Sequence, residues 1–532
     1  MKGFVFKYII LAFVILILGC IVRVVYAVWW KPKSLEKYFR RIGIKGSSYK
    51  LMYGDLEDTK KLMAQAWSKP MPLNHSIVPR VNPIWHLMVQ KYGKISLSWL
   101  ERKPRLLIAD AGLVKSILND KNGHFRKPPL NPLVDLLTLG VSTLEGDQWD
   151  KRRKLINPSF HHDKILNKSL LILDNEFLNE QRMVPTFIVS CGDLVKRWKQ
   201  KLSDSEGRLE LDIAPEMQML SSDVIARAAF GTSFEEAKAI FELQKEQAAL
   251  VLEAFLSLYF PGLRFLPTKK NRRRYEVDKK IKTMLNNMIL RKEKKIQNGK
   301  SDDDDDDDDD LLSLLLQSQK QIDNNMTTND VIEECKLFYF AGQETTANWL
   351  TWTMIVLSMH PSWQEKARDE VLQVFGKTTP DVKTINQLKI VPMILQEVLR
   401  LYPPVTGLSR YTLESTKIGD MTIPPGVELV LPTMLIHHDP HYWGQDVHEF
   451  KPQRFARGVS KDHEYHQMPF YPFGWGPRFC LGQNFALFEA KIALTMILQH
   501  FSFELSPSYT HAPFTVITLQ PQYGAPLVLR QI

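Results

Sequence analysis

One cysteine lies in a segment whose residue types suit the binding of iron. The segment reads Phe473-Gly474-Trp475-Gly476-Pro477-Arg478-Phe479-Cys480-Leu481-Gly482. A thiolate that binds haem iron must be unpaired and partly shielded from water, and backbone N–H donors stabilise it, so glycines on both sides of Cys480 would let the main chain fold closely around the sulfur. Arg478 is placed to reach a haem propionate, and Phe473 to shield the cysteine. A buried free cysteine in a glycine-rich turn is the simpler alternative.

The order Phe-x-x-Gly-x-Arg-x-Cys-x-Gly resembles the haem-binding loop of the cytochrome P450 monooxygenases. The resemblance implies haem b as the cofactor, Cys480 as its metal ligand, and Phe473, Arg478 and Gly482 as further haem contacts. It covers essentially the whole chain and implies a mainly helical fold with small β-sheets, preceded by one N-terminal transmembrane helix. Residues 338–346 and 501–507 are similar to the plant clan that oxidises triterpenoids, gibberellins, brassinosteroids and cytokinins.

An acid and an alcohol stand side by side at Glu344 and Thr345, after the small residues Ala341 and Gly342. Oxygen activation on a haem thiolate needs protons delivered to the distal oxygen without flooding the pocket with water. A Gly-x-Glu-Thr string alone is more often helix surface. With the resemblance, Glu344 and Thr345 are expected to form the catalytic pair for proton delivery, and Ala341 and Gly342 to leave room for dioxygen beside the haem.

Other motifs that follow the family's order imply contacts to the haem and to the substrate. Trp149 and Arg153 match the family's Trp-x-x-x-Arg motif, and with Arg410 and Arg478 they are expected to contact the haem propionates. A surface salt bridge is the alternative for each arginine. Candidates for the substrate pocket are Val405 to Leu408 and one or two of Phe338, Tyr339 and Phe340, although helix core is the simpler state for each aromatic.

Glu397 and Arg400 are spaced to pair on one helix face, which by itself is common on solvated surfaces. Residues 450–455 resemble the family's Phe-x-Pro-x-Arg-Phe segment, whose arginine, Arg454, is expected to join both in a structural network. Gln453 stands where many relatives have Glu, a departure that should matter little because the arginine is kept.

The segment Tyr8 to Trp30 is apolar except for Arg23 and predicts a membrane-spanning helix. Its 23 residues would extend about 34 Å, enough to cross a bilayer. Basic residues follow at once and predict that the rest of the chain is cytosolic. A cleaved signal peptide is the alternative, but no small-residue cleavage site follows. We therefore expect a single-pass protein, and the resemblance implies the endoplasmic reticulum membrane.

Composition and charge limit the kinds of partner. The net charge of +10 fits a membrane surface or an acidic protein partner, or nothing more than a solvated surface, whereas no basic and aromatic module predicts binding to nucleic acid. The four cysteines show no spacing typical of a disulfide framework. Motifs spread from 149 to 480 must enclose one cofactor, so we predict a membrane anchor over 1–30, a linker and lead-in over 31–90 broken by prolines, and one haem-thiolate catalytic domain over 91–532.

The elements that must position these residues can be read from periodicity. The pattern predicts strands at 94–100 and 105–108, a long helix from Asp330 to Met359, a hairpin over 418–426 and a final amphipathic helix from 484 to about 500. The nine aspartates of 302–310 predict a disordered loop, with calcium binding as the alternative. Residues 167–182 look like extra sequence relative to the clan.

The sequence thus predicts a monooxygenase that inserts one oxygen atom of O2 into a lipophilic small molecule, of the class of plant isoprenoids or hormones. Electrons would come from NADPH through the flavins of an NADPH-cytochrome P450 reductase, and exposed bases including Lys151, Arg152 and Lys154 would dock that partner. Two alternatives share the fold: an enzyme that rearranges hydroperoxides without a reductase, and a haem-binding protein without turnover. The pair Glu344 and Thr345 argues against both.

Overall fold

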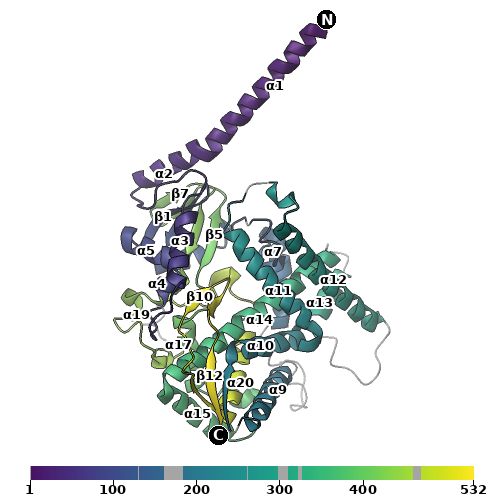
Figure 1. The fold of residues 1–532 in the computed structure, drawn as a ribbon, viewed down its shortest axis with the longest axis vertical. Coiled ribbons are helices and arrows are strands. Elements are labelled where there is room, and N and C mark those ends of the chain that lie inside the picture. Colours follow the sequence, from purple (N-terminus) through teal and green to yellow (C-terminus); the bar gives the residue numbers. More distant parts are fainter. Residues whose placement is uncertain are drawn as a thin grey trace.

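An apolar helix projects from the body of the protein at its N-terminal end (Figure 1). This computed structural model describes residues 2–129, 131–160, 184–205, 207–259, 262–297, 310–320, 326–458 and 469–532. Helix α1 (Lys2–Val25) continues through a π-helical turn (Tyr26–Trp30) into α2 (Lys31–Arg41). The stretch Phe6–Arg41 is long and apolar enough to cross a membrane, and its most apolar part contacts nothing in the body. This arrangement is consistent with single-pass membrane anchoring.

Residues 31–90, predicted as a linker and lead-in, pack against the body. Phe39 of α2 is fully buried, and the Tyr49 hydroxyl donates to the Val28 carbonyl at 2.6 Å. Three short helices, α3 (Leu56–Trp67), α4 (Val78–Val81) and α5 (Pro83–Tyr92), follow, so the prolines do prevent one long helix. Arg80 of α4 donates to the Pro513 carbonyl at 3.0 Å and also bonds Gln522, so this segment is tied to the C-terminal strands. The segment before residue 90 thus contacts the C-terminal part of the catalytic body.

Four small sheets accompany the helices in the part of the chain that the structure describes. The largest has the order β1 (Ile95–Leu100), β2 (Lys103–Ile108), β8 (Glu428–Leu431), β5 (Leu408–Thr412) and β3 (Phe125–Arg126). A second joins β4 (Arg208–Asp212), β12 (Pro526–Gln531) and β9 (Phe501–Leu505), and two hairpins pair β6 (Thr416–Ile418) with β7 (Met421–Ile423) and β10 (Pro513–Thr515) with β11 (Leu519–Pro521). The predicted first two strands and the hairpin near 418–426 are confirmed. The sheets therefore hold together segments from both ends of the chain.

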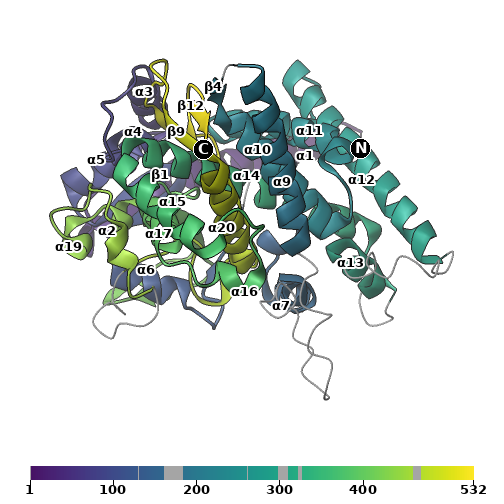
Figure 2. The same ribbon diagram turned by 90° about the horizontal axis from the view of Figure 1, so that it is seen from below.

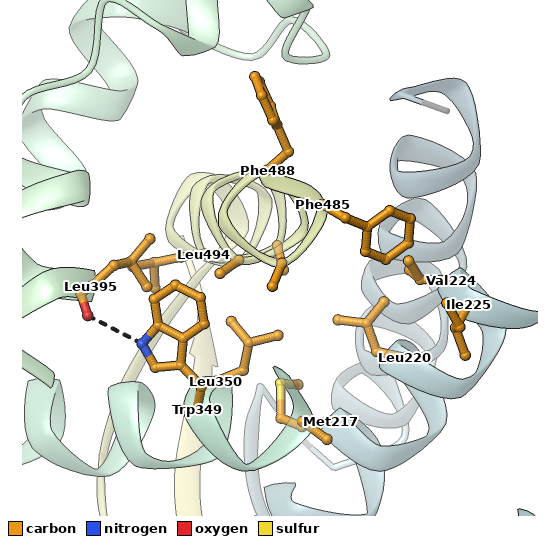
Figure 3. Close-up of a cluster of buried hydrophobic side chains, with 14 of the residues drawn as sticks. Met217, Leu220, Val224, Ile225, Trp349, Leu350, Leu395, Phe485, Phe488 and Leu494 are labelled. Atoms are coloured by element: carbon orange, nitrogen blue, oxygen red, sulfur yellow. Dashed lines mark hydrogen bonds between the residues drawn. The ribbon is translucent and has the colours of Figure 1, made fainter. Parts of the chain in front are cut away.

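The core is built around α14 (Thr328–Met359), whose predicted length is confirmed. Thr327 and Asp330 form a capping box at its start, and Pro361 follows its end. Side chains of α14, α10 (Ile213–Phe230) and α20 (Gln483–His500) form one buried cluster, in which the indole N–H of Trp349 on α14 donates to the Leu395 carbonyl of α17 (Ile390–Leu401) at 3.1 Å (Figure 3). Burial of α14 on almost every face explains its apolar content all round.

The final helix, α20, was predicted to be amphipathic, but it is buried on most sides. It lies between α15 (Pro361–Phe375) and α17 on one side and α9 (Val184–Ser203) and α10 on the other (Figure 2). Because α20 begins two residues after Leu481, its burial fixes the cysteine loop to the core. The other α-helices among the described residues are α6 (Ala111–Leu118), α7 (Gly146–Ile156), α11 (Phe234–Phe255), α12 (Lys269–Gln297), α13 (Leu311–Gln319), α16 (Val382–Ile385), α18 (Thr433–His437) and α19 (Pro440–Trp443).

Two predicted segments lie outside the described residues. The extra sequence at 167–182 is one of them, and the aspartate run 302–310 is the other except for its last residue. Asp310 does not belong to a disordered loop: its carboxylate accepts the Ser313 N–H at 2.7 Å as the N-cap of α13, and it also pairs with Lys292 at 3.0 Å. Placing a carboxylate at this position is favourable because it satisfies a free backbone donor at the positive end of the helix.

Glu397, Arg400 and Arg454 come together as predicted. Arg400 donates two hydrogen bonds to Glu397, at 2.7 and 2.8 Å, and further bonds to the His437 and Val447 carbonyls, and both charged side chains are fully buried. Arg454 lies 3.6 Å from Glu397 and is held more tightly by Asp446, at 2.7 Å. The network joins α17 to the irregular segment that precedes the cysteine loop.

Acid is expected to weaken the fold through His75, which lies in the segment between α3 and α4. Its ring bonds Tyr402 and His360 at 2.8 Å each, and burial, assisted by nearby His360 and His511, lowers its pKa from 6.5 to about 3. Below pH 6.5, His75 binds a proton in the unfolded chain but stays neutral in the folded chain until the pH approaches 3. The free energy of unfolding therefore falls as the pH drops below 6.5, and the contribution of His75 at pH 5 is a loss of about 2 kcal/mol. Urea midpoints at pH 7 and pH 5 should differ less in His75→Gln than in the unmodified chain.

The exposed histidine His441 serves as the control for that comparison. His441→Gln should leave the pH dependence of the urea midpoint unchanged. An unchanged dependence in His75→Gln would contradict the assignment to His75.

Candidate active site

Cys480 lies in a tight loop between a 3-10 turn (Gly476–Arg478) and α20. Its N–H donates to the Phe473 carbonyl at 2.8 Å, which closes the loop, and its sulfur accepts the Gly482 N–H. Cys480 is exposed to solvent, but the protein around its thiol raises the pKa of that thiol by burial. The Gly482 N–H and the charge of Arg153 act in the opposite direction and lower the pKa. A donated N–H and a nearby cation are features that favour a thiolate once iron replaces the proton.

The glycines of the loop have different roles. Gly476 has φ +70°, and a Cβ there would lie 2.2 Å from the Leu118 carbonyl oxygen at the end of α6, so no other residue fits. A Cβ at Gly482 would meet no atom within 4 Å, so its predicted part in the close folding of the chain is not seen; its N–H is the group that reaches Cys480. Phe473 packs edge-on against Trp349 of α14, with ring centroids 6.2 Å apart. The loop is thus fixed to both α6 and α14.

The predicted propionate contacts Trp149 and Arg153 lie on α7, beside the loop. Arg153 donates from Nη1 to the Phe479 carbonyl at 2.8 Å, and its Nη2 is buried without a hydrogen-bond partner. Arg478 stacks on the Trp149 ring, 4.5 Å from its centroid, and donates to the Leu144 carbonyl at 3.1 Å. An unpaired guanidinium nitrogen beside an available thiol indicates that an anionic group belongs here.

Two further cations complete this side of the site. Burial, with nearby Arg478, lowers the pKa of Arg410 on β5 to about 10, and Arg410 donates to the Ser409 carbonyl at 2.9 Å. Burial, with nearby Arg410 and Arg478, lowers the pKa of Lys127 to about 7, and Glu145 is the acid close to this group. Repelling cations with one carboxylate among them suit a dianionic ligand, as the two propionates of haem would be. The residues present therefore fit haem.

Sequence reasoning missed Lys127. Its only signal was a basic residue just before the Pro128-Pro129 pair and after Phe125 and Arg126 of β3, and nothing in the spacing connects it to Arg410 or Arg478. Pairing of β3 with β5 brings them together, with Arg126 opposite Tyr411. A two-residue strand is too short to predict from periodicity.

Arg152, predicted as part of an exposed docking patch, points into the protein instead. It donates to Glu334 of α14 at 2.7 Å and its side chain is 13% exposed, whereas Glu334 is fully buried. Glu334 also accepts the Val141 N–H at 3.1 Å, and burial raises its pKa to about 7 despite these contacts. The ion pair joins α7 to the first turns of α14, so Arg152 supports the helix that carries Trp149 and Arg153.

On α14, Glu344 and Thr345 occupy adjacent positions in a helix that is regular throughout this region. The Thr345 hydroxyl donates to the Ala341 carbonyl at 2.8 Å, one turn back. A Cβ on Gly342 would lie 2.6 Å from Cγ1 of Ile225. Its small size thus serves the contact between α14 and α10. Glu344 faces the β10–β11 hairpin, where Thr518 donates to its carboxylate at 2.7 Å.

The three aromatic residues before Ala341 all pack in apolar clusters, but Phe340 packs in a different cluster from the other two. Phe338 stacks on Phe160, with ring centroids 5.1 Å apart, and Tyr339 stacks on Phe230 at 4.0 Å, so both belong to the core. Phe340 belongs to a separate apolar cluster with Leu137, Val134, Ala248, Val251 and Ile517. This cluster joins four distant segments and is the best candidate for the substrate pocket. Of the other candidates, Val405, Gly407 and Leu408 are partly buried and Thr406 is buried.

Comparison with known proteins gives one consistent family. The family model described as Cytochrome P450 matches residues 79–523. Cytochrome P450 CYP72A616 from Paris polyphylla is 48% identical over 506 residues, which cover 95% of each chain. The 7-deoxyloganic acid hydroxylase of Catharanthus roseus is 46% identical over 99% of both chains, and secologanin synthase 2 of the same plant is 42% identical over 96% of this chain and 94% of its own.

Proposed function

The chain belongs to the cytochrome P450 family and is a cytochrome P450 monooxygenase, and we propose that it inserts one oxygen atom of O2 into a plant isoprenoid with electrons drawn from NADPH. Family membership implies a haem-thiolate cofactor, and haem b held by Cys480 is the form proposed here. When bound, this group supplies the activation of dioxygen. The observation that carries the proposal is the cysteine loop: an exposed thiol that accepts a backbone N–H and lies beside the unpaired guanidinium nitrogen of Arg153.

The chain's own residues divide the remaining work. Arg153, Arg410, Arg478 and Lys127 would hold the haem propionates, and Trp149 packs against Arg478. Glu344 and Thr345 would hold and pass protons, because an acid and an alcohol can relay a proton where bulk water is excluded. Ala341 places its carbonyl where it fixes the Thr345 hydroxyl, and Phe340 presents an apolar surface to the substrate.

The substrate class follows from the apolar cluster and from the relatives. An apolar site beside the partly buried Phe340 and Ile517 would favour a lipophilic molecule. One relative is named for 7-deoxyloganic acid and another for secologanin. Iridoids of this kind, and the larger isoprenoids that the clan resemblance implies, are therefore the first compounds to test.

The test uses the full chain in membranes together with a plant NADPH-cytochrome P450 reductase. We expect NADPH oxidation that depends on the reductase, a haem spectrum that shifts when 7-deoxyloganic acid or a triterpenoid is added, and a product that is heavier by one oxygen atom. Rearrangement of a hydroperoxide without reductase would indicate the hydroperoxide-rearranging class. Haem binding without NADPH oxidation under any of these conditions would indicate a protein without turnover. Either result would contradict the proposal.

We further propose that the N-terminal helix anchors the chain in the endoplasmic reticulum membrane with the catalytic domain in the cytosol. The exposed α1 and the basic residues that directly follow the π-helical turn support this orientation. Five bases, Lys31, Lys33, Lys37, Arg40 and Arg41, lie within α2, against one acid, Glu36. In this orientation the cysteine loop would share the compartment in which a reductase presents its flavins.

High salt is expected to slow turnover by weakening the approach of an acidic flavin domain to the cysteine side. Lys151 and Lys154 are exposed on α7, and Lys115 of α6 lies over the Trp475 ring of the cysteine loop, 5.3 Å from its centroid. Exposed charges are screened over about 10 Å at 0.1 M salt. Salt should therefore slow reductase-supported NADPH oxidation more than turnover driven by an added peroxide, and Lys151→Glu with Lys154→Glu should raise the apparent KM for reductase severalfold.

Lys279→Glu is the matched control, because Lys279 is exposed on α12, a helix that packs against α11 and α14. It should leave the reductase KM unchanged. Equal salt sensitivity of the two assays would show that charge does not control docking, and an unchanged KM in the α7 double variant would remove those lysines from the surface.

A further inference from the structure

We propose that Thr518, in the turn between β10 and β11, is a positioning residue that holds Glu344 in the orientation needed to transfer protons. Its hydroxyl donates to Oε1 of Glu344 at 2.7 Å across 174 positions of sequence. The inference rests on the proposed function, because it gives the acid of the proton relay a partner that no motif contains. It concerns one oxygen of one carboxylate, and it can be tested separately from the reaction.

The two oxygens of Glu344 are held very differently. Oε1 accepts from Thr518 at 2.7 Å, from the Gln520 amide at 2.8 Å and from the Asn348 amide at 3.1 Å. Among the residues that the structure describes, Oε2 accepts only from the Gln218 amide, at 3.4 Å. The lone pairs of Oε1 are occupied by three donors, so Oε2 is the oxygen with room to accept a transferred proton. Thr518 and its neighbours thus define which oxygen reacts.

The direction of the Thr518 hydroxyl is also determined. Asn348 donates its amide N–H to Thr518 Oγ1 at 3.0 Å, so the oxygen acts as the acceptor there and its own proton is directed to Glu344. Asn348 itself lies on α14, one turn after Glu344, and its amide also donates to the Glu344 backbone carbonyl at 2.8 Å. The bonds from Asn348 to Thr518 and on to Glu344 form a short chain of neutral donors around a carboxylate.

The turn that carries Thr518 is itself fixed to the core. The Leu519 N–H donates to the Pro404 carbonyl at 2.9 Å, and the Leu519 carbonyl accepts the indole N–H of Trp352 of α14 at 3.1 Å. Thr515 pairs with Leu519 across the hairpin, and Thr518 is 2% exposed. A side chain on so well-fixed a backbone can orient its partner, which is what a positioning residue requires.

The same hairpin also carries Ile517 of the apolar cluster that we assign to the substrate. Neighbouring residues of one turn thus face the substrate cluster and the proton-relay acid. A substrate that displaces Ile517 would therefore disturb the contact between Thr518 and Glu344, which links substrate binding to the orientation of the acid.

The test compares Thr518→Val with Thr515→Val in the full chain with reductase and NADPH, without any added organic substrate. Both changes replace a hydroxyl by a methyl group, but the Thr515 hydroxyl is buried without a hydrogen-bond partner. We expect the hydrogen peroxide formed per NADPH to rise about threefold to tenfold in Thr518→Val, since a positioned acid contributes at least that much to proton transfer. Thr515→Val should leave this ratio unchanged.

A double variant identifies the route of the effect. In Glu344→Gln the peroxide ratio should already be high, and adding Thr518→Val should not raise it further, because the acid that Thr518 orients is gone. An equal rise in both backgrounds, or a rise of the same size in Thr515→Val, would overturn the proposal and assign the effect to the packing of the hairpin.

Hydrogen exchange gives a readout that does not depend on turnover. Glu344→Gln should speed exchange of the amides of 516–520 severalfold, because bonds to a neutral amide are weaker than those to a carboxylate, and Thr515→Val should not. Unchanged exchange in Glu344→Gln would overturn the contact. If the unmodified chain oxidises no NADPH with reductase, the proposed function fails, while the exchange result still decides whether Thr518 holds Glu344.

Discussion

Replacing Cys480 by Ser or His is expected to abolish the absorbance band that a reduced haem thiolate shows with carbon monoxide, and to reduce turnover below detection. The sulfur is the iron ligand in this proposal, and neither oxygen nor imidazole donates electron density as a thiolate does. The geometry supports the assignment, because Cys480 accepts the Gly482 N–H and lies near Arg153 on an exposed surface of the loop. The measurement is a difference spectrum of reduced protein with and without carbon monoxide, normalised to protein.

Cys191 and Cys335 are the controls for this experiment. Both are buried, and burial raises the pKa of each thiol far above its usual value, so neither is available to iron. Cys191→Ala and Cys335→Ala should keep the thiolate band, although small losses of stability are expected from the removed sulfur atoms. A thiolate band that survives in Cys480→His would mean that another residue holds the iron.

The features that could be predicted from the sequence are those carried by short segments. The cysteine loop contains its ligand, its N–H donor and one arginine within ten residues. Helix α14 can be predicted from a capping box, a long apolar run and a following proline. Glu397 and Arg400 are three residues apart on one helix. In each case the neighbours in space are neighbours in the chain, so spacing alone defines the geometry.

The features that could not be predicted depend on which distant segments meet. Arg152 and Arg153 are adjacent and chemically identical, yet one turns to Glu334 and the other to the cysteine loop. Lys127 meets Arg410 only through a two-residue strand, and Thr518 meets Glu344 through a hairpin 174 positions later in the chain. Periodicity says which face of a helix is buried, but not which charged partner the next helix presents.

The same limit explains the glycines. A sequence motif treats Gly342, Gly476 and Gly482 alike, but their roles in the fold differ. Gly342 allows close contact with Ile225, and Gly476 has a positive φ and lies against the Leu118 carbonyl. Gly482 contributes the N–H that donates to the Cys480 sulfur. Only the first two exclude a side chain for steric reasons within the protein. Their substitution is therefore expected to disturb packing, whereas a change at Gly482 would act on the cysteine itself.

Removing Arg400 is expected to prevent accumulation of folded, haem-containing protein. Arg400 is fully buried and makes bonds to Glu397 and to the carbonyls of His437 and Val447. Arg400→Met keeps most of the volume but leaves the Glu397 carboxylate buried without its main partner, since Arg454 lies 3.6 Å away and is committed to Asp446. Loss of one partner of a buried pair costs about 3–5 kcal/mol, which is a large part of the stability of a typical domain.

Arg530→Met provides the matched comparison, because Arg530 also bonds a glutamate, Glu504, at 2.8 Å, but both side chains are about half exposed. An exposed pair contributes less than about 1 kcal/mol, so this variant should yield normal amounts of holoprotein. The measurement is haem content per chain and the urea midpoint of each variant. If Arg400→Met gave as much holoprotein as Arg530→Met, the network would not be what joins α17 to the segment before the cysteine loop, and the loop would have to be held by α6 and α14 alone.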